Sequence, residues 1–201
     1  LGDVYKRQHD IEGLVELMGG EQAFVGKLDS LFTADSSLEG DAVSADISGL
    51  IGQYAHGNEP SHHIIHMYNY VNQPWKTQEL IDRVLKEQYR NAPDGLSGNE
   101  DCGQMSAWYI LNAMGFYQVC PGKPVYSIGR PLFDKVTINL PEAKTFTIIT
   151  KNNSKDNKYI ESAMLNGQEL NIPFLEHKDI AAGGTLEITL TNQPTKWGVQ
   201  Q

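Results

Sequence analysis

The sequence predicts an α+β fold in which a helical part precedes a β region. Apolar side chains recur at helical spacing in the first part, whereas from Val125 onward they alternate with polar ones. A Pro-Gly-Lys-Pro turn at 121–124 separates the two patterns. We therefore expect a helical part at 1–124 and an antiparallel β region at 125–201.

The first helices are predicted from two amphipathic segments. His9 to Met18 and Glu21 to Phe32 each place apolar residues on one face, and Gly19-Gly20 lies between them. This pattern indicates a helical hairpin. The following span, Ala34 to Gly52, is rich in Asp, Ser and Gly and predicts a long loop.

Three more helices complete the helical part. Ser61 to Val71 is predicted as one helix with Ser61 at its cap. Gln73-Pro74-Trp75 opens the next, which runs to about Tyr89, because proline is tolerated in the first helical turn. Gly103 to Gly115 is largely apolar, which is typical of a buried helix, and Trp108 is expected to lie in the core of the protein. Helices of this length suit an α/α arrangement of antiparallel pairs.

The β region is predicted from alternation and turn signals. Residues 136–140, 146–149 and 186–190 alternate apolar and polar side chains. Asn166-Gly167 is a strong hairpin signal, and Gly183-Gly184 predicts another turn. These signals indicate an antiparallel arrangement.

Composition sets broad limits. The chain has 201 residues, 40% hydrophobic and 9% aromatic, which describes an ordinary globular protein. The net charge of −9 argues against a nucleic-acid partner, which would need a basic patch. No apolar run approaches the ~20 residues that span a bilayer. Residues 1–8 look like an assembly artefact, and we expect the chain to be the C-terminal part of a longer protein.

The two cysteines, Cys102 and Cys120, are predicted to be free, part-buried thiols. The helix between them would separate them by about 20 Å, at ~1.5 Å per residue. A disulfide needs Cα atoms within about 7 Å.

Candidate chemistry gathers between Asp94 and Phe116. Three glycines, at 95, 98 and 103, let the loop fold tightly, and Glu100 with Asp101 stands at the mouth of the buried helix. The positive end of the helix dipole favours carboxylates there. Two interpretations stay open on spacing alone: an active-site carboxylate, or a helix capped by Asp101.

Two motif blocks carry a resemblance to a known family. They are Asn99-Glu-Asp-Cys-Gly-Gln-Met-Ser-Ala-Trp-Tyr109, continued by Tyr126-Ser-Ile-Gly-Arg-Pro-Leu-Phe133, and His56-Gly-Asn-Glu-Pro-Ser-His-His63. Together they resemble the C-terminal part of glycoside hydrolase family 92, over roughly Gln53 to Trp197. The resemblance implies a calcium-dependent, inverting exo-α-mannosidase. It also implies an (α/α)6 barrel, preceded by a β-sandwich, of which 1–124 would hold the later helices.

The resemblance assigns a catalytic residue to the carboxylate loop. Asp101 matches the position of the family's general base, and the general acid would lie upstream of Leu1, so the chain alone is expected to be inactive. Relatives often carry a second acid where this sequence has Asn99, which we expect to position water or sugar. Glu100 would bind a hydroxyl, the metal or a backbone donor.

The second block suggests how calcium and the sugar are bound. Asn58 and Glu59, with Gln53 upstream, offer the oxygen atoms that calcium prefers. The ion would contact the O2 and O3 hydroxyls of mannose. A surface loop with a helix cap is the alternative for this block. The residues expected to contact substrate are His56, Glu59, His62, His63, Asn99, Glu100 and Gln104.

The sequence also allows other classes of function. His62 and His66 are four apart, as in zinc helices, but no Glu follows the first His, and the zinc interpretation is disfavoured. A calcium-assisted carbohydrate-binding or structural module without hydrolysis is the main alternative to an enzyme. The expected partners are α-mannoside glycans and the N-terminal remainder of the same protein. Family analogy places it outside the cytoplasm.

Overall fold

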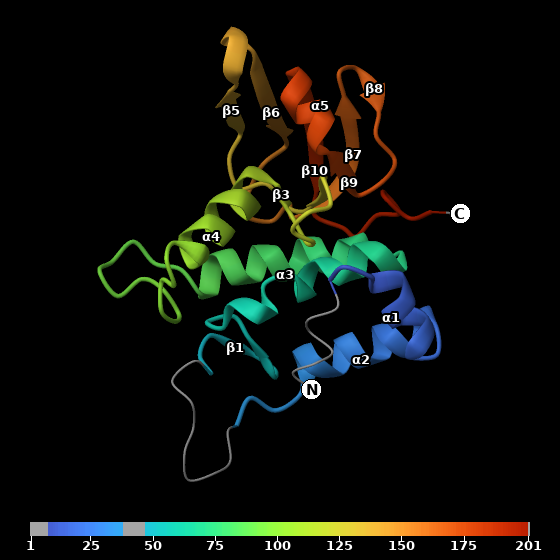
Figure 1. Cartoon of the computed structure of the whole chain (residues 1–201), viewed down its shortest axis with the longest axis vertical. Coiled ribbons are helices and arrows are strands. Elements are labelled where there is room, and N and C mark those ends of the chain that lie inside the picture. The colour runs from blue at the N-terminus through green and yellow to red at the C-terminus, as the bar shows by residue number, and fades with distance from the viewer. Residues whose placement is uncertain (1–7, 38–46, 201) are drawn as a thin grey trace.

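The computed structural model describes residues 8–37 and 47–200 (Figure 1). Its helical elements are α1 (Ile11–Leu17), α2 (Glu21–Thr33), η2 (Glu59–Ser61), η3 (Ile64–Val71), α3 (Pro74–Glu87), α4 (Gln104–Met114), η4 (Pro141–Ala143) and α5 (His177–Ala182). Its strands are β1 (Leu50–Ile51), β2 (Tyr54–Ala55), β3 (Phe116–Tyr117), β4 (Val125–Ile128), β5 (Lys135–Asn139), β6 (Thr145–Lys151), β7 (Tyr159–Leu165), β8 (Gln168–Glu169), β9 (Phe174–Glu176) and β10 (Gly184–Thr191). Figure 1 shows α3 crossing the middle of the molecule, with the β region on one side and α1, α2 and β1 on the other.

The predicted pair of N-terminal helices is confirmed. α1 begins after Asp10, whose carboxylate accepts a hydrogen bond from the Gly13 amide at 3.0 Å. Gly19 and Gly20 both have positive φ, +94° and +96°, which explains why the two helices end and begin at a glycine pair. The predicted loop at Ala34 to Gly52 is shorter than expected, because its end forms β1, which pairs antiparallel with β2. The rest of that loop, 38–46, and the suspected artefact up to residue 7 lie outside the described residues.

The predicted single helix from Ser61 to Val71 is wrong. The chain forms two 3-10 segments instead, and Ser61 ends η2 and caps neither segment. Two causes favour the tighter winding. β-Branched and aromatic residues are weak α-helix formers, and seven of the eight η3 residues are buried, so packing on every side sets the geometry.

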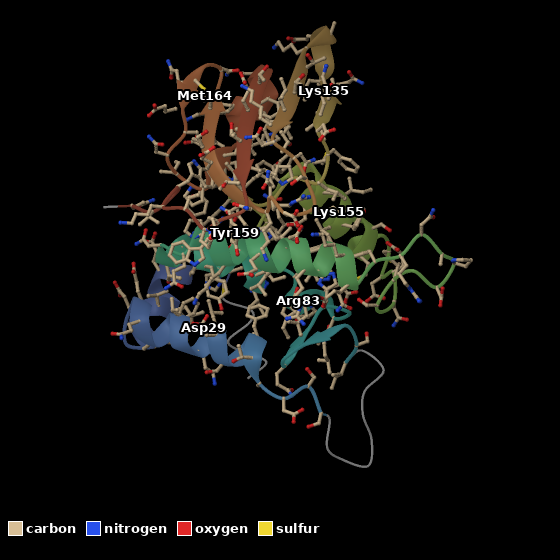
Figure 2. All side chains as sticks on the ribbon, turned by 180° about the vertical axis from the view of Figure 1, so that it is seen from behind. Asp29, Arg83, Lys135, Lys155, Tyr159 and Met164 are labelled. Carbon is tan, nitrogen blue, oxygen red and sulfur yellow. The ribbon has the colours of Figure 1, made fainter. Side chains whose placement is uncertain are left out.

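The predicted helix with proline in its first turn is confirmed as α3, which begins at Pro74. One apolar cluster, which includes Trp108 at 0% exposure, fills the space among the helices, and a second fills the β region. Gln78 of α3 joins the two parts, since its carbonyl oxygen accepts a hydrogen bond from the Ile160 amide at 2.9 Å. Figure 2 shows Tyr159, the neighbour of Ile160, beside α3, whereas Lys135 and Met164 lie toward the far end of the β region.

The β region is mixed, so the prediction of a purely antiparallel arrangement is wrong. The main sheet has the strand order β5-β6-β10-β7-β8. Ile188 of β10 pairs antiparallel with Ala163 of β7 and parallel with Thr150 of β6. After β8 the chain leaves the main sheet and forms β9 and α5. It then returns to the sheet as β10, which lies between β6 and β7. The predicted Asn166-Gly167 hairpin is confirmed between β7 and β8, with both residues at positive φ.

A second sheet links the two parts of the chain. Its order is β3-β4-β9, and β3 follows α4 directly through Gly115. The helical part therefore contributes a strand to the sheet that begins the β region. The (α/α)6 barrel stays a prediction, because such a barrel needs more helix pairs than the described residues contain. Among these residues, no helix has the length and apolar character to cross a membrane.

Candidate active site

The two motif blocks meet at a crossing of two glycines, Gly57 and Gly98. A Cβ atom on Gly98 would lie 2.6 Å from the Gly57 carbonyl oxygen, and one on Gly57 would lie 2.1 Å from the Ser97 carbonyl oxygen. Any other side chain would clash with backbone at these positions. The glycines thus press the block that begins at His56 against the loop that carries Asp101, although the two are far apart in sequence.

The loop reaches α4 through three successive residues in left-handed conformation. The φ angles of Asp101, Cys102 and Gly103 are +43°, +56° and +93°. Such a conformation costs a residue with a side chain roughly 1–2 kcal/mol, and strained residues often occur at functional sites. Backbone bonds close the turn, because the Gly103 amide donates to the Glu100 carbonyl at 3.1 Å and the Gln104 amide to the Asp101 carbonyl at 3.2 Å. Asp101 is exposed at the N-terminal end of α4.

Glu100, and not Asp101, satisfies the first turn of α4. Its carboxylate accepts hydrogen bonds from the Ser106 amide at 3.1 Å and from the Ser106 hydroxyl at 2.9 Å. The interpretation of Asp101 as the helix cap is therefore wrong. The left-handed turn at 101–103 lies between Glu100 and α4, and it brings the Glu100 carboxylate back to the helix. Binding a backbone donor was one of the three roles expected for Glu100, and the Ser106 amide is such a donor.

The histidines of the other block are buried in a hydrogen-bonded wall, which His56 and His62 form with their side-chain partners. The Tyr54 hydroxyl lies 2.9 Å from His56 Nδ1, and the Tyr89 hydroxyl lies 2.7 Å from His56 Nε2. Tyr89 in turn donates to the Met105 carbonyl at 3.1 Å, which ties His56 to the first turn of α4. Burial lowers the pKa of His56 to about 2, helped by the nearby His62, because a buried charge is costly. His56 is therefore neutral.

His62 and His66 do not converge on one site. His62 Nε2 lies 3.0 Å from the His56 carbonyl, whereas His66 bonds through its two ring nitrogens to Ser127 and Asn112, each at 3.0 Å. Within 8–37 and 47–200, no cluster of three or more His, Cys, Asp or Glu side chains could hold a metal ion. The geometry gives the zinc interpretation no support.

The predicted calcium ligands are only partly brought together. Asn58 and Glu59 are adjacent and half-buried, directly after the glycine crossing. Gln53 lies elsewhere, because its side-chain amide donates a hydrogen bond to the Asp35 carbonyl. It lines an apolar cavity together with residues of α2, and neither Asn58 nor Glu59 lines that cavity. Calcium takes 6–8 oxygen ligands. Asn58 and Glu59 fit calcium by their chemistry and would supply part of such a set.

The remaining predicted site residues differ in their exposure. Asn99 is exposed on the loop, and Gln104 is half-buried at the first position of α4. His63 is buried beside η3. Both cysteines are free as predicted, although Cys102 is exposed and Cys120 is buried rather than both being part-buried.

Sequence reasoning missed the polar partners that organise this wall. Tyr89, Asn112 and Tyr117 contact the histidines or Gln104. A polar residue inside an apolar run, such as Asn112 in α4, is the signal that could have identified one of them.

In the motif at 126–133, Arg130 is 3% exposed, and its guanidinium lies 3.4 Å from the Asp82 carboxylate of α3. That motif therefore joins α3 to the β region.

A family model and similar solved structures indicate the same family. The family model described as "Glycosyl hydrolase family 92 catalytic domain" matches residues 4–192. A curated protein of Arthroderma benhamiae, described as an uncharacterized secreted glycosidase, is 33% identical over 196 residues, which is 96% of this chain and 23% of that protein.

Two solved structures from Bacteroides thetaiotaomicron are also similar. One is a family GH92 α-mannosidase in complex with mannoimidazole, with a TM-score of 0.90, 38% identity, and coverage of 96% of this chain and 25% of that one. The other is a family GH92 inverting mannosidase, with a TM-score of 0.85, 42% identity, and coverage of 98% and 28%. The chain thus spans about a quarter of the length of these relatives.

Proposed function

The chain belongs to glycosyl hydrolase family 92, and we propose that the whole protein is an exo-α-mannosidase that inverts the anomeric centre with the help of calcium. Asp101 would be the general base. The observation that carries the proposal is the placement of Asp101: exposed, on a left-handed turn at the end of α4, and next to the block that offers oxygen ligands. Glu100 is already engaged with Ser106, which leaves Asp101 as the carboxylate able to accept a proton.

The proposed reaction divides between this chain and the rest of the protein. An inverting glycosidase needs a carboxylic acid that protonates the leaving oxygen and a carboxylate that activates water, about 6.5–9.5 Å apart. Asp101 would take the proton from water as the water attacks the anomeric carbon. Asn99, two residues earlier on the same exposed loop, would orient that water or the sugar. The acid would come from the N-terminal remainder.

Asn58 and Glu59 would hold the calcium ion. When bound, it would supply a positive charge that binds and orients hydroxyl groups of the sugar for attack. The glycine crossing supports this arrangement, because it places these ligands beside the loop of Asp101. His56 and His63, buried shortly before and after these residues in the chain, would shape the sugar site.

The relatives support a substrate class and a location. Two similar structures are described as mannosidases, one of them with mannoimidazole bound, and a relative is described as a secreted glycosidase. We infer that the substrates are α-mannosides of the N-glycan or mannan type, cleaved at their non-reducing ends outside the cytoplasm.

Removing calcium from the whole protein is expected to lower mannose release from α-mannobioses by about a hundredfold, since a metal that holds and polarises substrate contributes several kcal/mol. Mannose release followed with calcium, with a chelator, and with zinc added after the chelator would measure this. Full activity in chelator contradicts the role of calcium, and recovery by zinc alone assigns a different metal. Mannose that binds without any release supports the binding module instead.

A further inference from the structure

The protonation state of the His62 ring follows from its neighbours. His62 Nε2 lies 3.0 Å from the His56 carbonyl oxygen, which can only accept a hydrogen bond, so Nε2 carries the hydrogen. The His62 ring is 1% exposed, and a buried imidazolium is costly, so the ring is neutral. A neutral ring has one hydrogen, and Nδ1 is therefore a bare acceptor.

The bare Nδ1 fixes the side-chain amide of Gln104. The amide nitrogen lies 3.1 Å from His62 Nδ1, and only a donor is stable at that distance from a lone pair. The same nitrogen donates its second hydrogen to the Tyr117 hydroxyl at 3.3 Å. Both amide hydrogens are thus used inside the protein. In the part of the chain that the structure describes, no hydrogen bond uses the Gln104 carbonyl oxygen, and this oxygen is not among the buried polar atoms without a partner.

The His62 ring is itself held firmly. It stacks on His56 with ring centroids 4.9 Å apart, and the Trp108 indole donates to the His62 carbonyl at 3.1 Å. His62 is 1% exposed, whereas Gln104 is half-buried at the end of α4, three residues after Asp101. The buried ring therefore has no free atom to offer a ligand, but it determines which atom Gln104 offers.

We propose that His62 is a positioning residue, which fixes the Gln104 amide so that its carbonyl oxygen is presented as an acceptor for a sugar hydroxyl beside Asp101. The choice of a sugar as the ligand rests on the proposed function; the orientation of the amide does not. In this assignment His62 does not contact the substrate and acts on it only through Gln104. Gln104 accepts a hydrogen bond from the sugar and does not donate one.

Two substitutions at His62 separate positioning from simple packing, because each keeps one of the two ring bonds. His62→Asn places an oxygen near the position of Nδ1 and keeps an acceptor for Gln104. His62→Gln reaches the position of Nε2 and keeps the donor to the His56 carbonyl. In the whole protein, we expect the His62→Asn variant to bind mannose at least about tenfold more tightly than His62→Gln, by calorimetry, because one oriented hydrogen bond is worth about that factor. Equal affinities of the two variants, or tighter binding by His62→Gln, indicate a merely structural His62, and either result overturns the proposal.

A second readout needs no activity. Gln104→Ala is expected to lower Tm more in the wild-type and His62→Asn backgrounds than in His62→Gln, where the bond to His62 is already lost and only the bond to Tyr117 remains to be removed. It should likewise weaken mannose binding only in the first two. An equal fall of Tm in all three backgrounds overturns the proposal. A wild-type protein that neither binds nor releases mannose contradicts the proposed function, and the Tm cycle then still decides whether His62 fixes Gln104.

Discussion

Replacing Asp101 with asparagine is expected to lower kcat for α-mannoside hydrolysis by about 10²–10⁴-fold, the usual contribution of a positioned general base. An amide has nearly the shape of the carboxylate but does not accept the proton of the attacking water. Mannose binding should change little, since the sugar is held mainly by other groups. Tm should also be unchanged, because Asp101 is exposed and does not cap α4. Steady-state kinetics on the whole protein, with calorimetry and a thermal melt of the same variant, measure all three.

Glu100→Gln is the matched control, one residue away. Glu100 accepts two hydrogen bonds from Ser106, so this variant is expected to lose about 1 kcal/mol of stability, typical of a weakened helix cap, with a much smaller loss of kcat. If instead Asp101→Asn keeps its activity and Glu100→Gln loses it, the general base is Glu100.

The buried histidines are expected to make the protein strongly acid-sensitive below about pH 6.5. Burial lowers the pKa of His56, His62 and His66 to about 2, 4 and 3 from an ordinary value of 6.5. Below pH 6.5 the unfolded chain binds protons that the folded chain does not, so the free energy of unfolding falls as the pH falls. Each such group lowers the free energy of unfolding by about 1.4 kcal/mol per pH unit, and the three together lower it by about 4 kcal/mol per pH unit. This holds until the pH nears 4 and His62 protonates in the folded state.

Denaturation of the protein at a series of pH values from 7.5 to 5 would measure this slope. The His9→Gln variant is the control, because it removes a histidine that is exposed rather than buried. A stability that stays flat between pH 7 and 5 would contradict the burial of the three neutral rings.

The sequence predicted the elements whose signals are local. A glycine pair separated α1 from α2, a proline opened α3, and Asn166-Gly167 joined β7 to β8. It did not predict the 3-10 winding of η3 or the entry of β10 beside β6, because these depend on packing against segments distant in sequence.

The candidate site divides in the same way. Motif blocks named the residue types that gather there, and Asp101 and Glu100 were both candidates from spacing. Which of the two caps α4 depends on a left-handed turn through Cys102, a residue whose side chain gives no hint of that conformation. The role of Gly98 was only partly foreseen: it permits a close approach to Gly57 and does not need a positive φ. Partners of the histidines come from distant segments such as α4 and β4, so spacing within one motif could not reveal them.

The most direct test of the central claim is the anomeric configuration of the first mannose released by the whole protein. Proton NMR of an α-mannobiose digest, recorded before mutarotation, distinguishes the two anomers. A base at Asp101 that activates water for a single displacement predicts that β-mannose appears first and that its release is lost in Asp101→Asn. Initial release of α-mannose would contradict the account, because it requires two displacements and a carboxylate that attacks the sugar itself.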